Sequence, residues 1–337
     1  FFSDEAIQTL TAMDLVSRGL FGGDGSFLPV YFENGGQYNL SLSVWLQVLI
    51  TWLPNSVWLT RGLLAVLSLV FPLCGGLYLR DHLQARFWWL TPYLVSVIPA
   101  WFLHSRTAFE TTLGASLYCL FVFLYANYRL KARRWLIPAL TAGALTFYSY
   151  SPLQLVVVIS GVILLVVDWR YHFADPKSWR MGLAALVLLA APYLIFRLTH
   201  AEAFGQHLRI VRSYWIGGTS LINKFGQFFL RWLKGFNPYY WYFPNDTDLV
   251  RHLMKGYGHL PWLFLPFTLL GLWGCAKKWR QPANRILLIG LLAAPSGAAL
   301  VDVAITRLLV MIVPLALLTA LGMNEALVWL STKLRNW

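Results

Sequence analysis

Long hydrophobic runs separated by short polar segments dominate the pattern of this chain. A membrane-spanning helix needs about 20 mostly apolar residues, and runs near that length recur from residue 57 to residue 322. The sequence therefore predicts an all-α, polytopic transmembrane protein that forms a single domain over residues 1–337. About nine spans are expected, at residues 57–79, 87–104, 108–126, 134–149, 152–167, 181–198, 259–275, 285–301 and 304–322.

Two long polar stretches, 1–56 and 199–258, interrupt these runs. Segments of this length are uncommon inside a compact domain unless they are functional. The apolar run 40–53 is too short to span, which predicts a helix lying in the membrane interface. Aromatic and leucine residues recur at helical spacing over residues 225–236, with basic residues between them. That pattern predicts an amphipathic interfacial helix, which either anchors the loop or contacts a lipid phosphate.

Charge and composition support the membrane assignment and orient it. Hydrophobic residues make up 58% of the chain and charged residues 12%, whereas soluble domains carry about 25% charged residues. More than half of the 27 lysines and arginines fall in connections on one side of the predicted spans and in the C-terminal tail. This side is predicted to be cytoplasmic, so that 1–56 and 199–258 face outward. Because no basic domain lies outside the hydrophobic runs, the net charge of +13 does not indicate nucleic-acid binding.

The N-terminus and the cysteines add two further expectations. The chain begins at Phe1, directly before a polar segment, which leads us to expect a further hydrophobic span upstream. Cys74, Cys119 and Cys275 lie inside apolar runs without C-x-x-C spacing, which favours small core residues over a disulfide or a metal site.

Polar motifs at the outward ends of the spans point to one site. Ionisable groups are costly at membrane depth, so they usually line a cavity or pair with one another. Because these motifs share one face, they predict a single outward-facing polar cavity. They are the Asp4-Glu5 pair, HSRTAFE at 104–110, YSYSP at 148–152, RHLMKGYGHLP at 251–261, and Arg307.

The residue types in these motifs suit the transfer of a sugar. A carboxylate can act as general base on an acceptor hydroxyl. Arginine presents a fixed fork of donors to phosphate oxygens, and tyrosine can pack against a sugar face or hydrogen-bond its hydroxyls. Together they suit glycosyl transfer from a lipid phosphate with inversion at the anomeric carbon, the leaving phosphate being stabilised by the arginines.

The order of these motifs resembles a known family. The stretch from FFSDEA through LPVYFENGGQYN, VWLTRGLLAVLS, IPAWFLHSRTAFET and LTFYSYSPLQL looks like the bacterial relatives of the dolichyl-phosphate-mannose protein mannosyltransferases. These belong to the GT-C glycosyltransferases, which include the aminoarabinose transferases. The resemblance resumes at PNDTDLVRHLMKGYGHLPWLFLPFTLLGLWG and at PSGAALVDVAITRLLVMIVPLALLTALG, so it covers most of the chain. The acidic pair is its most specific mark.

The resemblance implies roles for individual residues. Asp4 matches the family's catalytic base, and Glu5 matches its acidic partner, which more plausibly orients the loop or the acceptor. Arg106 and Arg307 match arginines at the ends of spans and are candidate phosphate contacts. The remaining candidate substrate contacts are Tyr148, Tyr150, Arg251 and His252.

Several of these residues also have a purely structural interpretation. Arg106 could reach the headgroups or pair with Glu110 one turn later, and Arg307 could pair with Asp302. Many relatives carry an arginine where this chain has Gln154, so either another arginine takes over or phosphate binding is weaker. The sequence contains no histidine pair at i, i+4, so no metal is expected. A divalent cation bridging the acidic pair and the phosphate remains an alternative.

The sequence thus predicts a GT-C glycosyltransferase of the bacterial inner membrane with its active site facing the periplasm. The donor would be a polyprenyl-phosphate sugar, with mannose or a similar hexose as the default, and membrane lipid would surround it. The acceptor, whether protein, lipid or glycan, is left open. Two rival classes remain: a non-catalytic subunit of a larger membrane assembly with protein partners, which Gln154 favours, and a lipid or solute transporter. Against a transporter, the spans show no obvious inverted repeat.

Overall fold

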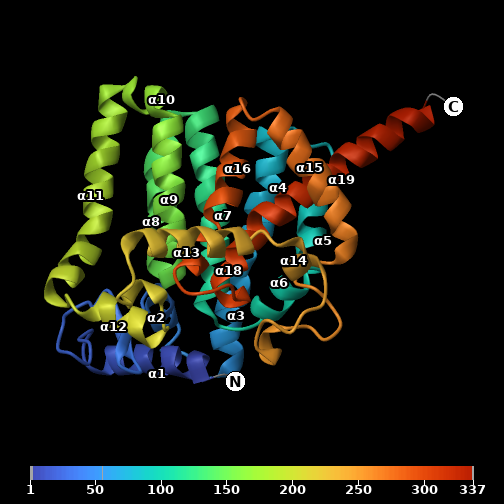
Figure 1. Ribbon diagram of the computed structural model, residues 1–337. Helices are drawn as coiled ribbons and strands as arrows, with labels where there is room; N and C mark the ends of the chain where they lie inside the picture. The colour runs from blue at the N-terminus through green and yellow to red at the C-terminus, as the bar shows by residue number, and fades with distance from the viewer. Residues whose placement is uncertain (1–2, 55, 336–337) are drawn as a thin grey trace.

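A computed structural model describes residues 3–54 and 56–335 and shows a bundle of helices (Figure 1). Within the described residues, four helical segments are long and apolar enough to cross a membrane. Each overlaps one predicted span, and two of them are continuous pairs of shorter helices. They are α3–α4 (Val57–Ser68 and Val70–His82), α7 (Glu110–Leu130), α11 (Pro176–Thr199) and α18–α19 (Ile305–Leu308 and Ile312–Arg335).

Shorter helices occupy the remaining predicted spans. They are α5 (Leu90–Ser96), α6 (Pro99–His104), α8 (Leu136–Ser149), α9 (Ser151–Val167), α15 (Leu265–Lys277), α16 (Pro282–Ala293) and α17 (Ser296–Ala299). Single 3-10 turns lie at Arg133–Trp135, Tyr214–Ile216, Val250–His252, Trp262–Phe264 and Leu309–Met311.

Two predicted spans are not continuous helices, and proline explains both breaks. Residues 87–104 divide at Ile98, whose ψ of 114° is extended because Pro99 follows it. Residues 285–301 divide between α16 and α17, next to Pro295. The prediction of one continuous helix was wrong at both places. Both breaks lie near segments that shape the candidate site, where irregular backbone is tolerated if protein surrounds it.

The interior of the bundle is built around α7 and α19. Helix α7 contacts α4 and α8, whereas α19 packs along α15. The α15–α19 contact is close because Gly271 and Gly322 face each other's helix, where an added Cβ would collide with the carbonyls of Leu318 and Phe267. Small residues at such crossings allow helix backbones to approach in membranes.

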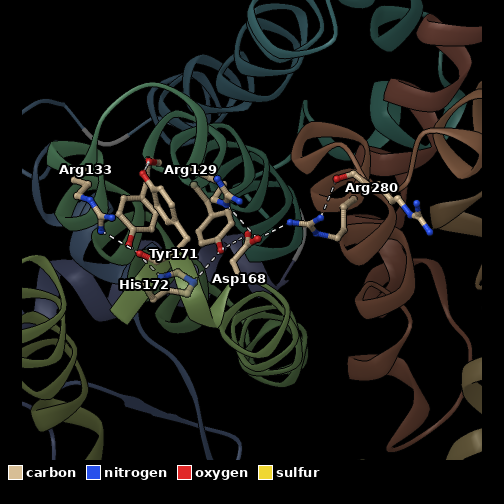
Figure 2. Close-up of polar contacts among 9 residues, drawn as sticks. Arg129, Arg133, Asp168, Tyr171, His172 and Arg280 are labelled. Atoms are coloured by element: carbon tan, nitrogen blue, oxygen red, sulfur yellow. Dashed lines mark hydrogen bonds and ion pairs between the residues drawn. The ribbon is translucent and has the colours of Figure 1, made fainter. Parts of the chain in front are cut away.

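A polar network ties the helices together at one end of the bundle, the α10 end at the top of Figure 1. Figure 2 shows Asp168, which precedes α10 (Trp169–Phe173), between two arginines. Its Oδ1 lies 3.1 Å from Arg129 Nε and 2.5 Å from Arg285 Nη2, and Tyr125 donates to its Oδ2 at 3.0 Å. Helices α7, α9 and α16 are therefore joined through one buried carboxylate.

The two long polar stretches meet at the opposite end, the α1 end at the bottom of Figure 1. His207 Nδ1 lies 2.7 Å from Gln37 Oε1, and His200 Nε2 lies 3.3 Å from Asp24 Oδ2. The first stretch forms α1 (Ser3–Ser17), a hairpin of β1 (Phe32–Asn34) and β2 (Gln37–Leu40), and α2 (Leu42–Val48). The second forms α12 (Ala203–Ile210), α13 (Leu221–Lys234) and α14 (Pro238–Tyr242).

These stretches differ from the sequence prediction in two details. The interfacial helix expected at 40–53 is the shorter α2, and the hairpin before it was not predicted. The hairpin turns at Gly35 and Gly36, both with positive φ, a conformation that glycine adopts without steric cost. The amphipathic helix expected over 225–236 is α13, which buries none of its residues and is held by a 2.8 Å hydrogen bond from Trp232 to the Leu292 carbonyl.

Candidate active site

The structure brings the polar motifs together at the α1 end. Ala108 N–H donates to Glu5 Oε1 at 2.8 Å, which joins the acidic pair to the HSRTAFE stretch. The His104 and His252 rings stack with centroids 5.2 Å apart, which adds the second polar stretch. Tyr150 and Arg307 lie in the wall of one cavity. Phe1 and Phe2, which open the first motif, lie outside the described residues.

The cavity has a volume of about 460 Å³ and lies between α8, α9, α11, α12 and the start of α18. Two arginines, one carboxylate and several aromatic rings contribute to its wall. The polar lining residues that matter here are Glu110, Tyr150, Gln154, Arg197, His207 and Arg307. Rings from Tyr31, Tyr38, Phe147, Tyr193, Phe196 and Phe204 form much of the rest. Such a mixed apolar and charged wall can receive a ligand with an anionic group and a flat or apolar part.

Arg307 is held at the cavity by the backbone around it. Its Nη1 donates to the Asp302 carbonyl oxygen at 3.4 Å, whereas the Asp302 carboxylate accepts the Val303 N–H at 2.8 Å. No ion pair between these two side chains is present within the part of the chain that the structure describes. The guanidinium charge therefore remains available to an anion in the cavity.

Asp248 fixes the start of α18, two residues before Arg307. Its Oδ1 accepts the Ile305 N–H at 2.7 Å, and its Oδ2 accepts Tyr240 Oη–H at 2.8 Å and contacts His259 Nε2 at 3.1 Å. Asp248 and His259 side chains are 3% and 2% exposed. Burial raises the pKa of Asp248, but the hydrogen bonds from His259, Ile305 and Tyr240 outweigh it and hold that pKa below the ordinary value. The carboxylate is therefore ionised near neutral pH.

Asp4 and Glu5 have different surroundings although they are neighbours in the first turn of α1. Glu5 is fully buried, and its carboxylate accepts two hydrogen bonds from Arg61, at 2.9 and 2.8 Å, besides the one from Ala108. Asp4 is exposed and lies within electrostatic reach of Glu110 and Tyr150. The Glu5 carboxylate is therefore engaged by Arg61 and Ala108, and a cation bridging the acidic pair would have to displace Arg61 from it.

Four other candidate residues, Arg106, Tyr148, Arg251 and His252, do not line the cavity. Arg106 is exposed and stacks over the Phe102 ring at 3.5 Å, while Glu110 receives a hydrogen bond from Gln8 instead. Tyr148 Oη donates to the Leu189 carbonyl at 2.7 Å and so binds α8 to α11. Arg251 is exposed and donates to His252 at 3.2 Å.

His252 belongs to the second polar stretch, and its ring contacts His104 and Phe109 of the HSRTAFE stretch. Burial, and then Arg251, lower its pKa below the ordinary value, and the opposing effects of Asp248 and Asp4 are smaller. The ring is 7% exposed, and its Nε2 accepts from Arg251. The lowered pKa keeps the His252 ring neutral near pH 7, and the ring packs against His104 and Phe109.

Three lining residues were not singled out from the sequence. Arg197 lies in the last turn of α11, His207 in α12 and Tyr31 before the hairpin. Each stands in a segment whose local pattern indicates only a span end or a loop, and only tertiary packing brings them together. One signal was present in the sequence. Where many relatives carry an arginine this chain has Gln154, which implied that either another arginine takes over or phosphate binding is weaker. In the structure, Gln154 Nε2 donates to Tyr31 Oη at 2.8 Å.

No cluster of three or more histidine, cysteine, aspartate or glutamate residues suited to a metal ion occurs in residues 3–54 and 56–335. The three cysteines are free and buried. The charged and histidine side chains in the cavity wall belong to Arg197, Arg307, Glu110 and His207.

Comparison with known proteins clarifies the fold. No family model matches the chain, and no curated protein matches it in sequence. Among solved structures, ArnT from Cupriavidus metallidurans bound to undecaprenyl phosphate matches over 96% of this chain with a TM-score of 0.65 and 13% identity. The fold is similar to that of ArnT. The apo form of ArnT matches over 95% of the chain with a TM-score of 0.60 and 12% identity.

The likeness to ArnT confirms the predicted helical membrane fold of GT-C type. The chain covers 56% and 55% of the two ArnT chains, so it spans about half of their length. A shared fold supports many activities, and the chemistry must therefore be argued from the cavity and its residues.

Proposed function

We propose that this chain is a membrane glycosyltransferase that takes a sugar from a polyprenyl-phosphate carrier. The supporting observation is the cavity at the α1 end, where Arg307 and Tyr150 share a wall with Glu110 and where Asp4 is within electrostatic reach. In this proposal Arg307 binds the phosphate, the aromatic wall contacts the sugar, and the Asp4 carboxylate takes the proton. ArnT, whose fold is similar, is described in complex with undecaprenyl phosphate.

The proposed reaction is a single displacement with inversion. The acceptor hydroxyl oxygen attacks the anomeric carbon while the bond from that carbon to the phosphate oxygen breaks. Asp4 accepts the hydroxyl proton, and Glu5 holds the helix turn that carries Asp4 through its contacts with Arg61 and Ala108. Arg307 stabilises the charge that develops on the leaving phosphate.

The donor, acceptor and location follow as proposals. The carrier is a polyprenyl phosphate, the sugar is mannose or a similar hexose, and the acceptor is a hydroxyl on a protein, lipid or glycan. We place the protein in the bacterial inner membrane, with the α1 end facing the periplasm. The supporting feature is the distribution of basic residues. Arg80, Lys131 and Arg285 lie in connections at the α10 end, where they form ion pairs with Asp81 or Asp168. An excess of basic residues is expected of a cytoplasmic face.

The test is label transfer in nanodiscs from a panel of radiolabelled polyprenyl-phosphate sugars to crude membrane extract. The variant is Asp4→Asn, and the matched control is Asp14→Asn, a second exposed acid on α1 that pairs with Arg18 at 2.9 Å. We expect transfer by the wild type and the control, and a loss of at least about 100-fold in Asp4→Asn, the scale of general-base catalysis. Full transfer by Asp4→Asn would remove Asp4 from the mechanism.

A non-catalytic subunit is the second candidate. It is favoured by Gln154, a neutral residue in the cavity wall that is already bonded to Tyr31. This alternative predicts no turnover of any donor and stable co-purification of membrane protein partners. A transporter would instead move an intact donor between leaflets without cleaving it, and the same nanodisc panel separates these results.

A further inference from the structure

Arg197 is a cavity residue that forms no ion pair with residues 3–54 or 56–335. It lies in the last turn of α11, a helix at the edge of the bundle (Figure 1). Its guanidinium lies 5.1 Å from the Phe204 ring centroid. Its Nη1 is buried and has no hydrogen-bond partner within the described residues. A buried, unsatisfied donor is costly, and more so when it is charged. The geometry therefore leaves a place for an acceptor from outside the chain.

The rest of the cavity wall indicates that this acceptor is an anion. Arg197 and Arg307 both line the cavity, and Glu110 is the only carboxylate among its described lining residues. Glu110 already accepts a hydrogen bond from Gln8 at 3.3 Å. Two permanent cations and one engaged carboxylate leave an excess of positive charge, which a phosphate group with several acceptor oxygens would neutralise.

The surface next to the cavity indicates that the phosphate is carried by a lipid. Val158 lines the cavity, and Val162 and Val166 follow it at helical spacing on α9. All three are exposed, by 48%, 54% and 64%. They form an apolar stripe that leads from the cavity wall along a membrane-embedded helix, and an acyl or prenyl chain can lie along it.

We propose that Arg197 and Arg307 together bind the phosphate of the lipid-linked donor, Arg197 from α11 and Arg307 from α18. Arginine is suited to this role because its planar fork donates two parallel hydrogen bonds to phosphate oxygens. Gln154, in the same wall, donates to Tyr31 and supplies no charge. The inference rests on the proposed function, because it assigns the phosphate of that donor.

The test measures binding of undecaprenyl phosphate to the protein in phosphatidylcholine nanodiscs. Arg197→Gln removes the charge, Arg197→Lys keeps it without the fork, and Arg209→Gln is the control. Arg209 is 56% exposed on α12, pairs with Glu202 and lies outside the cavity wall. We expect Arg197→Gln to raise the Kd about 10- to 100-fold, Arg197→Lys to raise it less, and Arg209→Gln to leave it within about twofold.

A charge swap keeps the test specific. Gln154→Arg in the Arg197→Gln background places a guanidinium elsewhere in the same wall, and we expect it to recover part of the lost affinity. Unchanged affinity in a folded Arg197→Gln variant, as judged by its elution as a single species, would overturn the role of Arg197. Wild-type protein that binds no undecaprenyl phosphate would overturn the proposed donor as well.

Two competitors identify the source of the phosphate. Phosphatidylglycerol in the nanodisc and inorganic phosphate in solution both offer phosphate oxygens. We expect neither to displace undecaprenyl phosphate when present in tenfold excess. Equal competition by phosphatidylglycerol would show a general anionic-lipid site, and displacement by inorganic phosphate would show a soluble-anion site. Either result would overturn the assignment to the carrier.

Discussion

Arg307 is a charged residue at the start of a long apolar helix, and its surroundings explain why it is tolerated there. Among the described residues, its Nη1 donates a hydrogen bond to the backbone carbonyl of Asp302, whereas the Asp302 carboxylate accepts one from the Val303 N–H. The charge faces a cavity that also contains Tyr150 and Glu110. Charged side chains in such positions usually mark a ligand path, which is the role proposed for Arg307.

Arg307→Gln is expected to weaken donor use by about 10- to 100-fold in kcat/KM, because a charge-assisted contact to phosphate is lost. Arg106→Gln is the informative comparison, since Arg106 stacks on Phe102 outside the cavity wall. We expect Arg106→Gln to stay within about threefold of the wild type. Label transfer from the active donor checks both. A larger loss in Arg106→Gln than in Arg307→Gln would contradict the placement of the phosphate.

Substitutions of Glu5 and Asp4 should differ in their effect on stability. Glu5→Ala removes the buried carboxylate that accepts hydrogen bonds from Arg61 and from the Ala108 N–H, and the Arg61 side chain is only 31% exposed. We expect Glu5→Ala to cost about 2–4 kcal/mol of unfolding free energy, with a clearly lower Tm in detergent. Asp4→Ala, at an exposed position, should change the Tm little while abolishing transfer. Equal Tm values for the two variants would show that Glu5 is not structural.

At the residue scale, the sequence predicted two residues that line the cavity. Tyr150 and Arg307 were predicted because a tyrosine or an arginine at the end of an apolar run can be recognised from the sequence alone. Arg197 and His207 were missed because they enter the cavity only when α11 and α12 fold back over the first polar stretch. Tyr148 was assigned to substrate, but its hydroxyl is used between helices, at the Leu189 carbonyl.

Short broken helices at the α1 end are held by specific polar contacts rather than by length. Helix α18 forms the first four residues of the α18–α19 segment, and the Asp248 carboxylate accepts the Ile305 N–H at its start at 2.7 Å. Asp248 is therefore a positioning residue for Arg307, acting through the backbone of α18.

Asp248→Asn is expected to raise the KM for the donor several-fold more than it lowers kcat, because the position of Arg307 loosens. A pH profile checks the origin of the effect. Since the pKa of folded Asp248 lies below its ordinary value, the stabilisation is present above about pH 4 and is lost as pH falls through the lowered pKa. The stability difference from Asp248→Asn should thus be largest near neutral pH and shrink on acidification. A difference that does not depend on pH would contradict this account.

The network around Asp168 predicts a strong effect at the α10 end. Asp168→Ala leaves Arg129 and Arg285, 24% and 15% exposed, without their carboxylate. Removing one partner of a buried ion pair costs about 3–5 kcal/mol. Asp175→Ala is the control, because Asp175 is 36% exposed and caps α11 through Lys177 N–H, a contact worth about 1 kcal/mol. Thermal unfolding in nanodiscs checks both, and similar losses would show that the network does not hold the bundle.

Element boundaries were the weaker part of the sequence prediction. Each predicted span contains a helix, because hydropathy reports burial in lipid. The breaks near Ile98 and Pro295 were missed because the runs stay apolar through them. The hairpin at 32–40 was missed because a short polar strand pair carries little periodic signal.

Across the whole molecule, the two ends differ in what their charges do. At the α10 end, Arg129 and Arg285 both form ion pairs with the buried carboxylate of Asp168 (Figure 2). At the α1 end, Arg197 and Arg307 line a cavity with one carboxylate. The α10 end thus contains an ion-pair network that joins helices, and the α1 end contains the cavity in which we propose that an anion binds. The likeness to ArnT over 96% of the chain shows that the chain has a known helical membrane fold.

The measurement that tests the central claim most directly is a structure of the protein in a nanodisc with undecaprenyl phosphate. The account predicts phosphate density in the cavity within about 3 Å of Arg307 Nη atoms, the distance of a charge-assisted hydrogen bond, with the chain leaving along α9. Density for the phosphate at the α10 end, or on the bundle surface away from Arg307, would contradict it.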